Sequence, residues 1–356
     1  MSQIINQFIP AVHTYDAVGS TALLMDRFFK KLGFRSRIYA LYRDPEVADR
    51  VQIYQKETRP QVDQDLNILH FALPSPLTEF FQACGGQRVI IYHNITPPHF
   101  FRGFQDDLVD FTALGLREIK SLSTDAVRTV AYSDFSARDL REMGFSNPEI
   151  LPFLIDWDRY TRTENRVLAR ILAHDWVNIL FVGRLVPNKK QDDLVRLLTV
   201  FRNSFHKKTR LILVGKGREG EKYLYEITKL IHQLGNPPVI FAGRVSPAEL
   251  VTYYKHSHAF VCMSEHEGFC VPLIEAMHFQ LPIIAYHSAA IPDTLQDAGI
   301  ILKDKDFMEI AAWMHKVIFD EAVRTSVLSK QNQRLRDFRL AQALPKWEAY
   351  IMSLLE

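Results

Sequence analysis

Two acidic side chains lie close together in one short stretch in the second half of the chain. Glu267 and Glu275 are separated by seven residues, with Gly268 directly after the first and Pro272 shortly before the second. Carboxylates accept hydrogen bonds from hydroxyl groups, so a sugar or a ribose is a natural partner for such a pair. Two solvated glutamates on a surface helix would show the same spacing. The stretch is therefore a candidate site for a hydroxyl-rich ligand, with a surface helix as the alternative.

A strand and a helix must hold these two glutamates in place. The apolar run 259–263 is short and rich in strand-forming residues, which predicts a buried strand. Pro272 fits the first turn of a helix, where its missing N–H costs nothing. A helix that begins directly after a tight loop presents free backbone N–H groups and the positive end of its dipole, which suits a phosphate.

A second loop carries cations. The predicted strand 177–182 ends at Gly183, and Arg184, Lys189 and Lys190 follow before the next predicted helix. A guanidinium and an ammonium in one loop can hold a diphosphate, the first as a fork and the second as a point charge. A solvated loop is the alternative.

Other strand ends offer weaker candidates. His93 ends the predicted strand 89–93, directly before a proline-stiffened loop, where its imidazole can donate to a sugar hydroxyl or a phosphate. A structural histidine is an equally good interpretation. Gly19 opens the helix after the first strand, and a simple turn also explains it. Gly215 and Gly243 likewise follow predicted strands, and neither is persuasive alone.

Composition limits the class of protein. A length of 356 residues favours two domains, and the apolar share of 47% with 24% charged residues is typical of a soluble globular protein. A formal charge of only +2 gives no global basic field for nucleic acid. Three cysteines without ligand spacing favour a reducing cytosol. The sequence shows no signal peptide and no bilayer-spanning run, so we expect a cytoplasmic protein.

Short apolar runs alternate with amphipathic stretches, which predicts an α/β fold with parallel sheets. In such folds ligands bind beyond the carboxyl ends of the strands. The pattern loosens near residues 155–160, which separates a domain 1–160 from a domain 170–339. The predicted strands are 4–8, 37–41, 66–73, 89–93, 129–132, 149–153, 177–182, 209–214, 239–242, 259–263 and 281–286. The predicted helices are 17–32, 78–83, 105–122, 136–143, 163–173, 307–319, 321–338 and 340–354.

Two segments mix aromatic and basic residues. Residues 27–37 and 97–104 both have the composition of peripheral membrane contacts. A cationic helix end explains the first equally well, and core packing under a loop explains the second.

Metal binding is not predicted. The strings Asp63-x-Asp65, Asp156-x-Asp158 and Asp304-x-Asp306 fit a short cation motif that arises often by chance. No set of histidine and carboxylate residues has persuasive ligand spacing. Cations at Arg184 and Lys189 would make a metal redundant for neutralising a bound diphosphate.

The strongest motifs resemble those of a known family. The stretch from Glu267 to Glu275 resembles the E-x7-E signature of GT-B glycosyltransferases, particularly the family 4 retaining enzymes, whose usual form is E-G-F-G-x-P-x-x-E-A. Cys270 stands where a second glycine is usual, so a side chain projects where the backbone would approach a hexose. The runs G-R-L-V-P-N-K from Gly183 and Y-H-N-I-T-P around His93 are similar to further motifs of that family.

The resemblance implies two Rossmann-like domains facing a central cleft, with the tail 340–356 joining the first domain. It implies that Arg184 and Lys189 hold a diphosphate, that Glu267 holds hexose hydroxyls and that Glu275 holds the ribose. His93 would contact the donor sugar near the reacting carbon. The implied donor-binding set is Gly19, Gly183, Arg184, Lys189, Gly215, Gly243, Arg244, Val245, Glu267, Gly268, Phe269, Cys270, Val271 and Glu275, and the implied catalytic set is His93, Arg184, Lys189 and Glu267.

The resemblance further implies a retaining transfer of a hexose from a nucleoside diphosphate sugar to a saccharide or lipid-linked saccharide in polysaccharide biosynthesis, without a cofactor. UDP-glucose is the favoured donor and GDP-mannose the alternative. A nucleotide-sugar epimerase, a two-domain solute-binding protein and a non-catalytic scaffold are the other candidates. We expect the protein in the cytoplasm, with the inner face of the plasma membrane as a second location.

Overall fold

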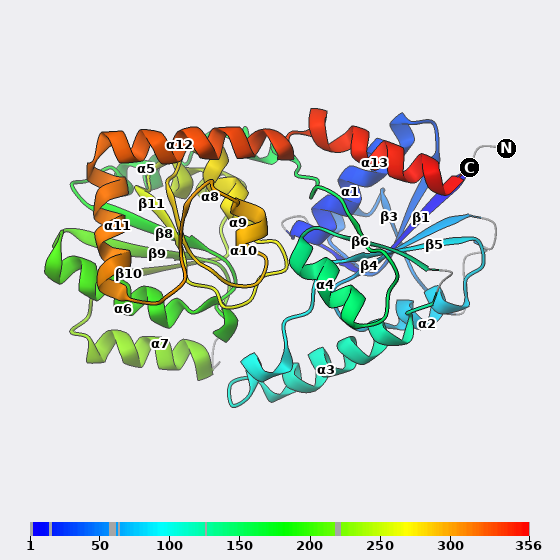
Figure 1. The fold of residues 1–356 in the computed structure, drawn as a ribbon, viewed down its shortest axis with the longest axis horizontal. Helices are drawn as coiled ribbons and strands as arrows, with labels where there is room; N and C mark the ends of the chain where they lie inside the picture. Colours follow the sequence, from blue (N-terminus) through cyan, green and yellow to red (C-terminus); the bar gives the residue numbers. More distant parts are fainter. Residues whose placement is uncertain are drawn as a thin grey trace. The chain divides into compact units, whose positions relative to one another are not determined.

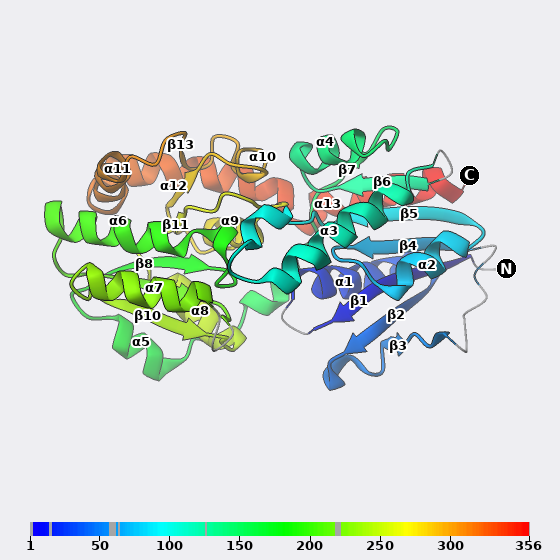
Figure 2. The ribbon, with the colours of Figure 1, turned by 90° about the horizontal axis from the view of Figure 1, so that it is seen from below.

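The computed structural model describes residues 3–13, 16–56, 62, 65–124, 127–217 and 222–355. The chain divides into two compact units (Figure 1). The first unit comprises Met1–Pro97, Asp110–Asp156 and Asp337–Glu356, and the second comprises Pro98–Val109 and Trp157–Arg336. Each unit contains one sheet with helices on both faces (Figure 2).

The first unit is built on a seven-stranded parallel sheet of order β3-β2-β1-β4-β5-β6-β7. All six residues of β4 are buried, as expected for a strand that is covered on both faces. The strands are β1 Ile4–Val12, β2 Arg35–Arg43, β3 Val51–Ile53, β4 Leu66–Phe71, β5 Gln87–Tyr92, β6 Val127–Ala131 and β7 Glu149–Ile150. The helices are α1 Ala17–Lys31, α2 Pro76–Ala83, α4 Asp134–Glu142 and α13 Leu340–Leu355, with the short turn η1 Pro45–Val47. Helix α3 Asp106–Ser121 begins in the second unit and belongs to the first from Asp110 on.

The second unit is built on a six-stranded parallel sheet of order β10-β9-β8-β11-β12-β13. The strands are β8 Val177–Val182, β9 Thr209–Val214, β10 Val239–Gly243, β11 Ala259–Cys262, β12 Ile283–Tyr286 and β13 Ile300–Leu302. The helices are α5 Arg166–Leu172, α6 Gln191–Ser204, α7 Lys222–Gln233, α8 Pro247–Lys255, α9 Val271–His278, α10 Ile291–Leu295, α11 Phe307–Phe319 and α12 Glu321–Leu335. The 3-10 turns are η3 Pro98–Phe101, η4 Trp157–Tyr160, η5 Pro187–Lys189 and, at the boundary of the units, η6 Arg336–Phe338.

The strand order reverses once in each sheet. The reversal lies between β1 and β4 in the first unit and between β8 and β11 in the second. In open α/β sheets, ligands bind beyond the carboxyl ends of the strands at such a switch point. The predicted class, α/β with two Rossmann-like parallel-sheet domains, is confirmed. The loops after β8 and β11 are those that carry the predicted cations and acids.

The last helix belongs to the first unit. The indole of Trp347 in α13 is fully buried, and its Nε1 donates to the backbone oxygen of Pro152 at 2.9 Å. Burial of so large a ring provides much of the free energy that holds a terminal helix in place. Strand β1 and helix α13 therefore lie in the same unit although they are the two ends of the chain (Figure 1).

The aromatic rings of residues 27–37 are mostly packed inside the first unit. Phe28 is 6% exposed and Phe29 is fully buried. Arg27 forms an ion pair with Asp156 at 2.9 Å, and Lys30 forms one with Asp26 at 3.0 Å. These contacts explain the aromatic and basic composition of the segment by packing within the protein.

The segment Pro98–Val109 follows β5 but packs with the second unit. Phe101 is buried, the ring of Phe100 lies 5.9 Å from that of His266, and the ring of Phe104 meets Tyr223 edge-on at 5.5 Å. These rings therefore have partners within the fold. Among the residues that the structure describes, no helix combines the length and apolar character needed to span a bilayer.

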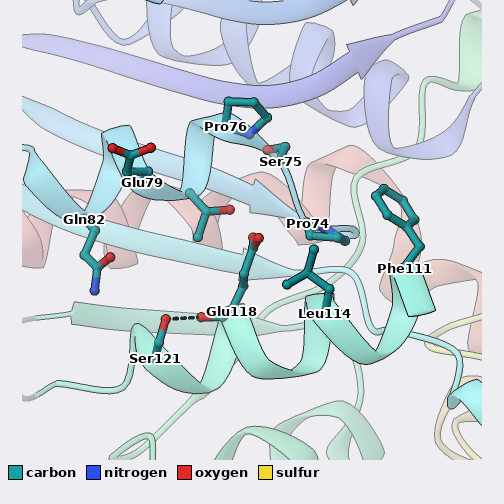
Figure 3. Close-up of a pocket in the computed structure, with 10 residues that line it drawn as sticks. Pro74, Ser75, Pro76, Glu79, Gln82, Phe111, Leu114, Glu118 and Ser121 are labelled. Atoms are coloured by element: carbon teal, nitrogen blue, oxygen red, sulfur yellow. Dashed lines mark hydrogen bonds between the residues drawn. The ribbon is translucent and has the colours of Figure 1, made fainter. Parts of the chain in front are cut away.

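A groove of about 450 Å³ runs between α2 and α3 in the first unit (Figure 3). Pro74 and Pro76 form one wall, and the half-exposed side chains of Phe111 and Leu114 form the other. Gly115 lets α3 come close, because a Cβ there would lie 2.9 Å from the Pro74 ring. None of the predicted site residues lines this groove.

Candidate functional site

Lys189 and Glu267 meet at the switch point of the second sheet. Lys189 ends the turn η5 after β8, and Glu267 lies in the loop between β11 and α9. The Lys189 Nζ lies 2.5 Å from a carboxylate oxygen of Glu267. Both side chains are largely buried, with exposed fractions of 17% and 10%. The sequence predicts both residues for the site, and the structure joins them in an ion pair.

Asn188 ties the loops of this pair together. Its Nδ2 donates to the backbone oxygen of His266 at 3.0 Å, and its backbone oxygen accepts from the Glu265 N–H at 2.8 Å. Asn188 is 1% exposed, so these hydrogen bonds form where water does not compete. Asn188 directly precedes Lys189, but an asparagine in a loop gives no sign in the sequence that it ties two loops together.

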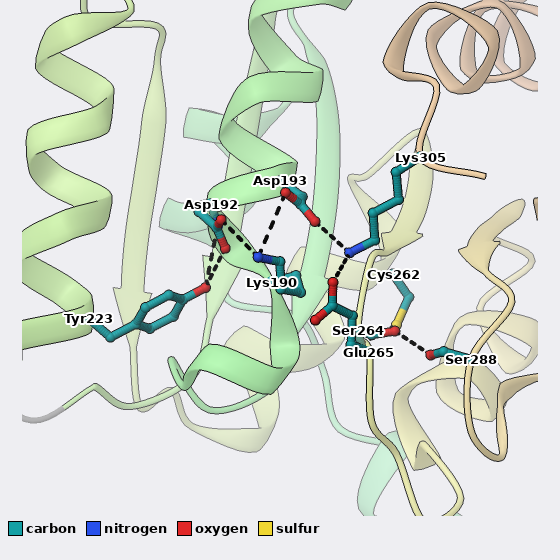
Figure 4. A network of polar contacts seen from close by, with 9 residues as sticks. All are labelled: Lys190, Asp192, Asp193, Tyr223, Cys262, Ser264, Glu265, Ser288 and Lys305. Atoms are coloured by element: carbon teal, nitrogen blue, oxygen red, sulfur yellow. Dashed lines mark hydrogen bonds and ion pairs between the residues drawn. The ribbon is translucent and has the colours of Figure 1, made fainter. Parts of the chain in front are cut away.

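A network of further charges braces the same loops (Figure 4). The Lys305 Nζ contacts Asp193 at the start of α6 and Glu265 after β11, each at 2.6 Å. Lys190 is paired with Asp192 at 3.1 Å, within the loop that leads into α6. Lys305 follows β13, and no pattern in the sequence around it predicts its ion pairs with Asp193 and Glu265.

Three glycines end adjacent strands of the second sheet and lie against one another. The Gly183 N–H donates to the Val214 oxygen at 2.8 Å, and the Gly215 N–H donates to the Gly243 oxygen at 2.9 Å. Gly215 has φ +145°, and a Cβ there would lie only 1.9 Å from the Gly183 oxygen. The close backbone approach therefore requires glycine at position 215.

The predicted residues beside these glycines differ in how exposed they are to solvent. Arg184 and Arg244 are exposed, and Val245 is half-buried. The backbone oxygen of Arg184 accepts from the Gln191 side chain at 2.8 Å, which fixes the loop while the guanidinium faces outward. Arg184 is thus an exposed cation close to the end of β8.

Cys270 takes the backbone conformation that glycine favours. Its φ is +69°, in the left-handed region, at the residue that precedes α9. Gly268 is half-buried and Phe269 is buried, and the Phe269 oxygen accepts from the Thr294 hydroxyl. Val271 begins α9. Glycine adopts this conformation freely, whereas for a residue with a side chain it costs about 1–2 kcal/mol.

The Cys270 side chain points towards Cys262 and Glu267. One ligand atom from each of the three lies within 4.8 Å of the others, and among the described residues this is the one such trio. The hydrogen bond with Cys262 and burial raise the pKa of Cys270 well above its usual value, so its thiol stays protonated. A cation here would also lie beside the Lys189 ammonium, which already neutralises Glu267. The Lys189 ammonium would therefore compete with a metal ion for the Glu267 carboxylate.

The Asp-x-Asp strings have other partners. Asp156 pairs with Arg27, and the Asp306 side chain accepts from the first N–H groups of α11 as its N-cap. Asp63 lies outside the described residues. The expectation that the protein needs no metal stays a prediction.

Glu275 is held by two tyrosines. The Tyr254 hydroxyl donates to one carboxylate oxygen at 2.6 Å, and the Tyr160 hydroxyl donates to the other. Glu275 is only 5% exposed. Burial and the Glu275 charge raise the pKa of Tyr254 well above its usual value, so the hydroxyl keeps the proton that it donates. The sequence predicts Glu275 but not its partners, which come from η4 and α8.

The first unit holds the other two predicted residues. His93 directly follows β5 and is partly exposed, and its ring contacts those of His70 and Tyr132. Gly19 lies in the first turn of α1, where its N–H donates to the capping Asp16 carboxylate at 3.0 Å. A Cβ at position 19 would lie 3.1 Å from the His13 backbone, so glycine lets the helix start close to the end of β1.

Comparison with known proteins adds a family match in the second unit. Residues 172–335 match the family model of group 1 glycosyl transferases. The amylovoran biosynthesis glycosyltransferase AmsD of Erwinia amylovora is 29% identical over 192 residues, which are 53% of this chain and 49% of that protein. The GDP-mannose-dependent alpha-mannosyltransferase of Mycobacterium tuberculosis is 30% identical over 186 residues, which are 51% of this chain and 45% of that protein. The chain thus spans about half the length of the curated relatives it matches.

Solved structures share the fold over the whole chain. Anabaena Alr3699/HepE in complex with UDP and glucose has a TM-score of 0.77 and 16% sequence identity, covering 99% of this chain and 100% of that one. At this identity the likeness concerns the fold alone. The likeness in fold extends to both units, whereas the family match at residues 172–335 lies in the second unit.

Proposed function

We propose that this chain is a glycosyltransferase that moves a hexose from a nucleoside diphosphate sugar to a saccharide or lipid-linked saccharide acceptor in polysaccharide biosynthesis, with retention of anomeric configuration. The observation that carries the proposal is the Lys189–Glu267 ion pair at the switch point of the second sheet. It lies inside residues 172–335, which match the glycosyl transferase family. The name of AmsD, a biosynthetic glycosyltransferase, supports the kind of pathway.

Lys189 and Arg184 act on the leaving group. As the glycosidic bond breaks, negative charge grows on the β-phosphate, and a fixed ammonium stabilises that charge more in the transition state than in the ground state. Arg184 provides a second, outward-facing cation from the same loop. Glu267 accepts hydrogen bonds from hexose hydroxyls, which are donors of the right kind for a buried carboxylate.

UDP-glucose is the donor we favour. The likeness to a structure described in complex with UDP and glucose supports this choice. GDP-mannose is the alternative, which the relative named as a GDP-mannose-dependent mannosyltransferase supports. Both donors present a diphosphate to Lys189 and hydroxyls to Glu267, so the same residues serve either.

A thermal-shift panel tests the donor class. A ligand that binds only the folded state at 100 times its Kd stabilises it by about 2.7 kcal/mol. We expect a clear rise in Tm with UDP-glucose, and a rise with GDP-mannose instead if the alternative holds. No response to any sugar nucleotide would contradict the proposal.

Kinetics of Lys189→Ala test the role of the ammonium. Loss of one preorganised charge-stabilising group lowers kcat by about 100- to 1,000-fold, and we expect the donor Kd to change much less. The matched control is Lys208→Ala, since Lys208 precedes β9 at the amino end of the sheet and its side chain forms an exposed ion pair with Asp175. Equal losses in Kd and kcat would remove the transition-state role. Proton NMR of the product should show the donor's anomeric configuration, and activity should survive a chelator.

A further inference from the structure

Three polar side chains form a chain across neighbouring strands of the first sheet. Gln7 lies on β1, His70 on β4, and His93 directly after β5, and these strands are adjacent. The Gln7 Oε1 lies 3.0 Å from the His70 Nε2, and the His70 Nδ1 lies 3.1 Å from the His93 Nε2. Gln7 and His70 are fully buried, whereas His93 is partly exposed. The chain thus runs from the core to a partly exposed residue at the carboxyl end of the sheet.

The contacts of Gln7 set the direction of this chain. Its Nε2 donates to the backbone oxygen of Ala22 in α1 at 3.2 Å, so the Oε1 is the atom that faces His70. An amide oxygen only accepts, and the His70 Nε2 must therefore carry the hydrogen. Burial lowers the pKa of His70 to about 3, so this ring is neutral and has a single N–H.

The tautomer of His70 fixes that of His93. Because His70 uses its N–H on Gln7, its Nδ1 is an acceptor, and the hydrogen between the two rings belongs to the His93 Nε2. Burial and the neighbouring His70 lower the pKa of His93 well below its usual value, so this ring is also neutral. Its one N–H is already committed, which leaves Nδ1 as an acceptor.

We infer that Gln7 and His70 are positioning residues that hold His93 in the tautomer with hydrogen on Nε2, so that Nδ1 accepts from a ligand hydroxyl. The identity of that hydroxyl as one of the donor sugar rests on the proposed function. The inference narrows the chemistry expected from the sequence, in which His93 donates to a hydroxyl or a phosphate. A deprotonated phosphate has no hydrogen to give, so it cannot pair with this Nδ1. His93 therefore selects a hydroxyl over a phosphate oxygen.

NMR of the full chain labelled with ¹⁵N-histidine reads the tautomer directly. Long-range ¹H–¹⁵N correlations separate a protonated ring nitrogen from an unprotonated one. The chain has 13 histidines, so the His93 signals are assigned by their loss in His93→Gln. We expect hydrogen on Nε2 and none on Nδ1 at neutral pH. A His93 that carries hydrogen on Nδ1, or on both nitrogens, overturns the inference.

Two variants of His70 separate positioning from packing. His70→Leu fills the space but offers His93 no acceptor, so its tautomers should mix. His70→Gln can donate to Gln7 and accept from His93, so the tautomer should be restored. The loss of one net hydrogen bond predicts a fall of up to about tenfold in kcat/KM for His70→Leu and near-normal activity for His70→Gln. Unchanged His93 signals in His70→Leu would refute the role of His70.

The spectra need no sugar nucleotide, which keeps the two proposals distinct. Hydrogen on the His93 Nε2 together with no response to any sugar nucleotide supports the positioning and refutes the proposed function. A response to UDP-glucose together with hydrogen on the His93 Nδ1 supports the proposed function and refutes the positioning. Should His70→Leu fail to fold, the spectrum of the unaltered chain still decides the tautomer.

Discussion

Replacing Gly215 by alanine should destabilise the second unit far more than the same replacement at Gly243. Both glycines end neighbouring strands and both have positive φ, +145° and +66°. They differ in crowding. A Cβ at position 215 would lie 1.9 Å from the Gly183 oxygen and 2.6 Å from its carbonyl carbon, whereas nothing lies within 4 Å of a Cβ at position 243. The pair therefore separates steric crowding from backbone strain.

The two costs follow from these contacts. At Gly243, left-handed strain of about 1–2 kcal/mol is partly offset by about 0.4–1 kcal/mol from a less flexible unfolded chain, which leaves about 1 kcal/mol. At Gly215, relief of the overlap requires the strand ends to separate by more than 1 Å, since non-bonded atoms rest about 3.5 Å apart. That movement disturbs the hydrogen bonds from Gly183 and Gly215 to the neighbouring strands, each worth about 1 kcal/mol. Together with strain, the loss is about 4 kcal/mol.

Scanning calorimetry measures this difference. For a unit of this size, 1 kcal/mol moves Tm by about 2–4 °C. We expect Gly243→Ala to lower Tm by a few degrees and Gly215→Ala to lower it by about 8–16 °C. Equal shifts would show that the approach of Gly215 to the Gly183 backbone is not what demands glycine there.

Two further outcomes follow from buried charges. Lys305→Met leaves Asp193 and the partly exposed Glu265 without their shared cation. The free energy of unfolding in urea should fall by about 2 kcal/mol, which is less than the 3–5 kcal/mol lost when a fully buried pair is broken. A change under about 0.5 kcal/mol would contradict the role of this network. Burial lowers the pKa of both His70 and His266 from 6.5 to about 3, so the unfolded chain binds protons at these histidines more tightly than the folded chain does. The free energy of unfolding should therefore be at its full value above pH 6.5. Between pH 6.5 and 3 it should fall by about 1.4 kcal/mol per pH unit for each histidine. Urea titrations at pH 7 and 5.5 measure that slope, which His70→Gln should reduce; an unchanged slope would refute the contribution of His70.

The sequence predicts strands best where they are central and apolar. β8 and β9 have the predicted bounds 177–182 and 209–214, because each is a nearly continuous run of buried residues between polar segments. β3 and β13 are not predicted, since each has three residues at the edge of its sheet. Three residues are too few to show a period, and only pairing with a neighbour makes them strands.

The sequence predicts which loops carry the candidate site residues, but not which of these residues contact one another. The ion pair of Lys189 and Glu267 depends on β8 and β11 being neighbours, which is a property of the sheet and not of spacing in either loop. The tyrosines that hold Glu275 come from distant elements with no motif of their own. His70 looks like any buried residue of a strand, and only its contacts on both sides distinguish it.

The Lys189–Glu267 pair couples recognition of the two halves of the proposed donor. A diphosphate that attracts the Lys189 ammonium draws it away from Glu267, and a buried carboxylate that loses its partner costs about 3–5 kcal/mol. Sugar hydroxyls donate hydrogen bonds, so a hexose beside the diphosphate restores partners to Glu267. A nucleoside diphosphate without its sugar offers no such donors at that position. Under the proposed function, the pair would therefore favour the intact donor over the spent nucleotide, which is the preference that transfer followed by product release requires.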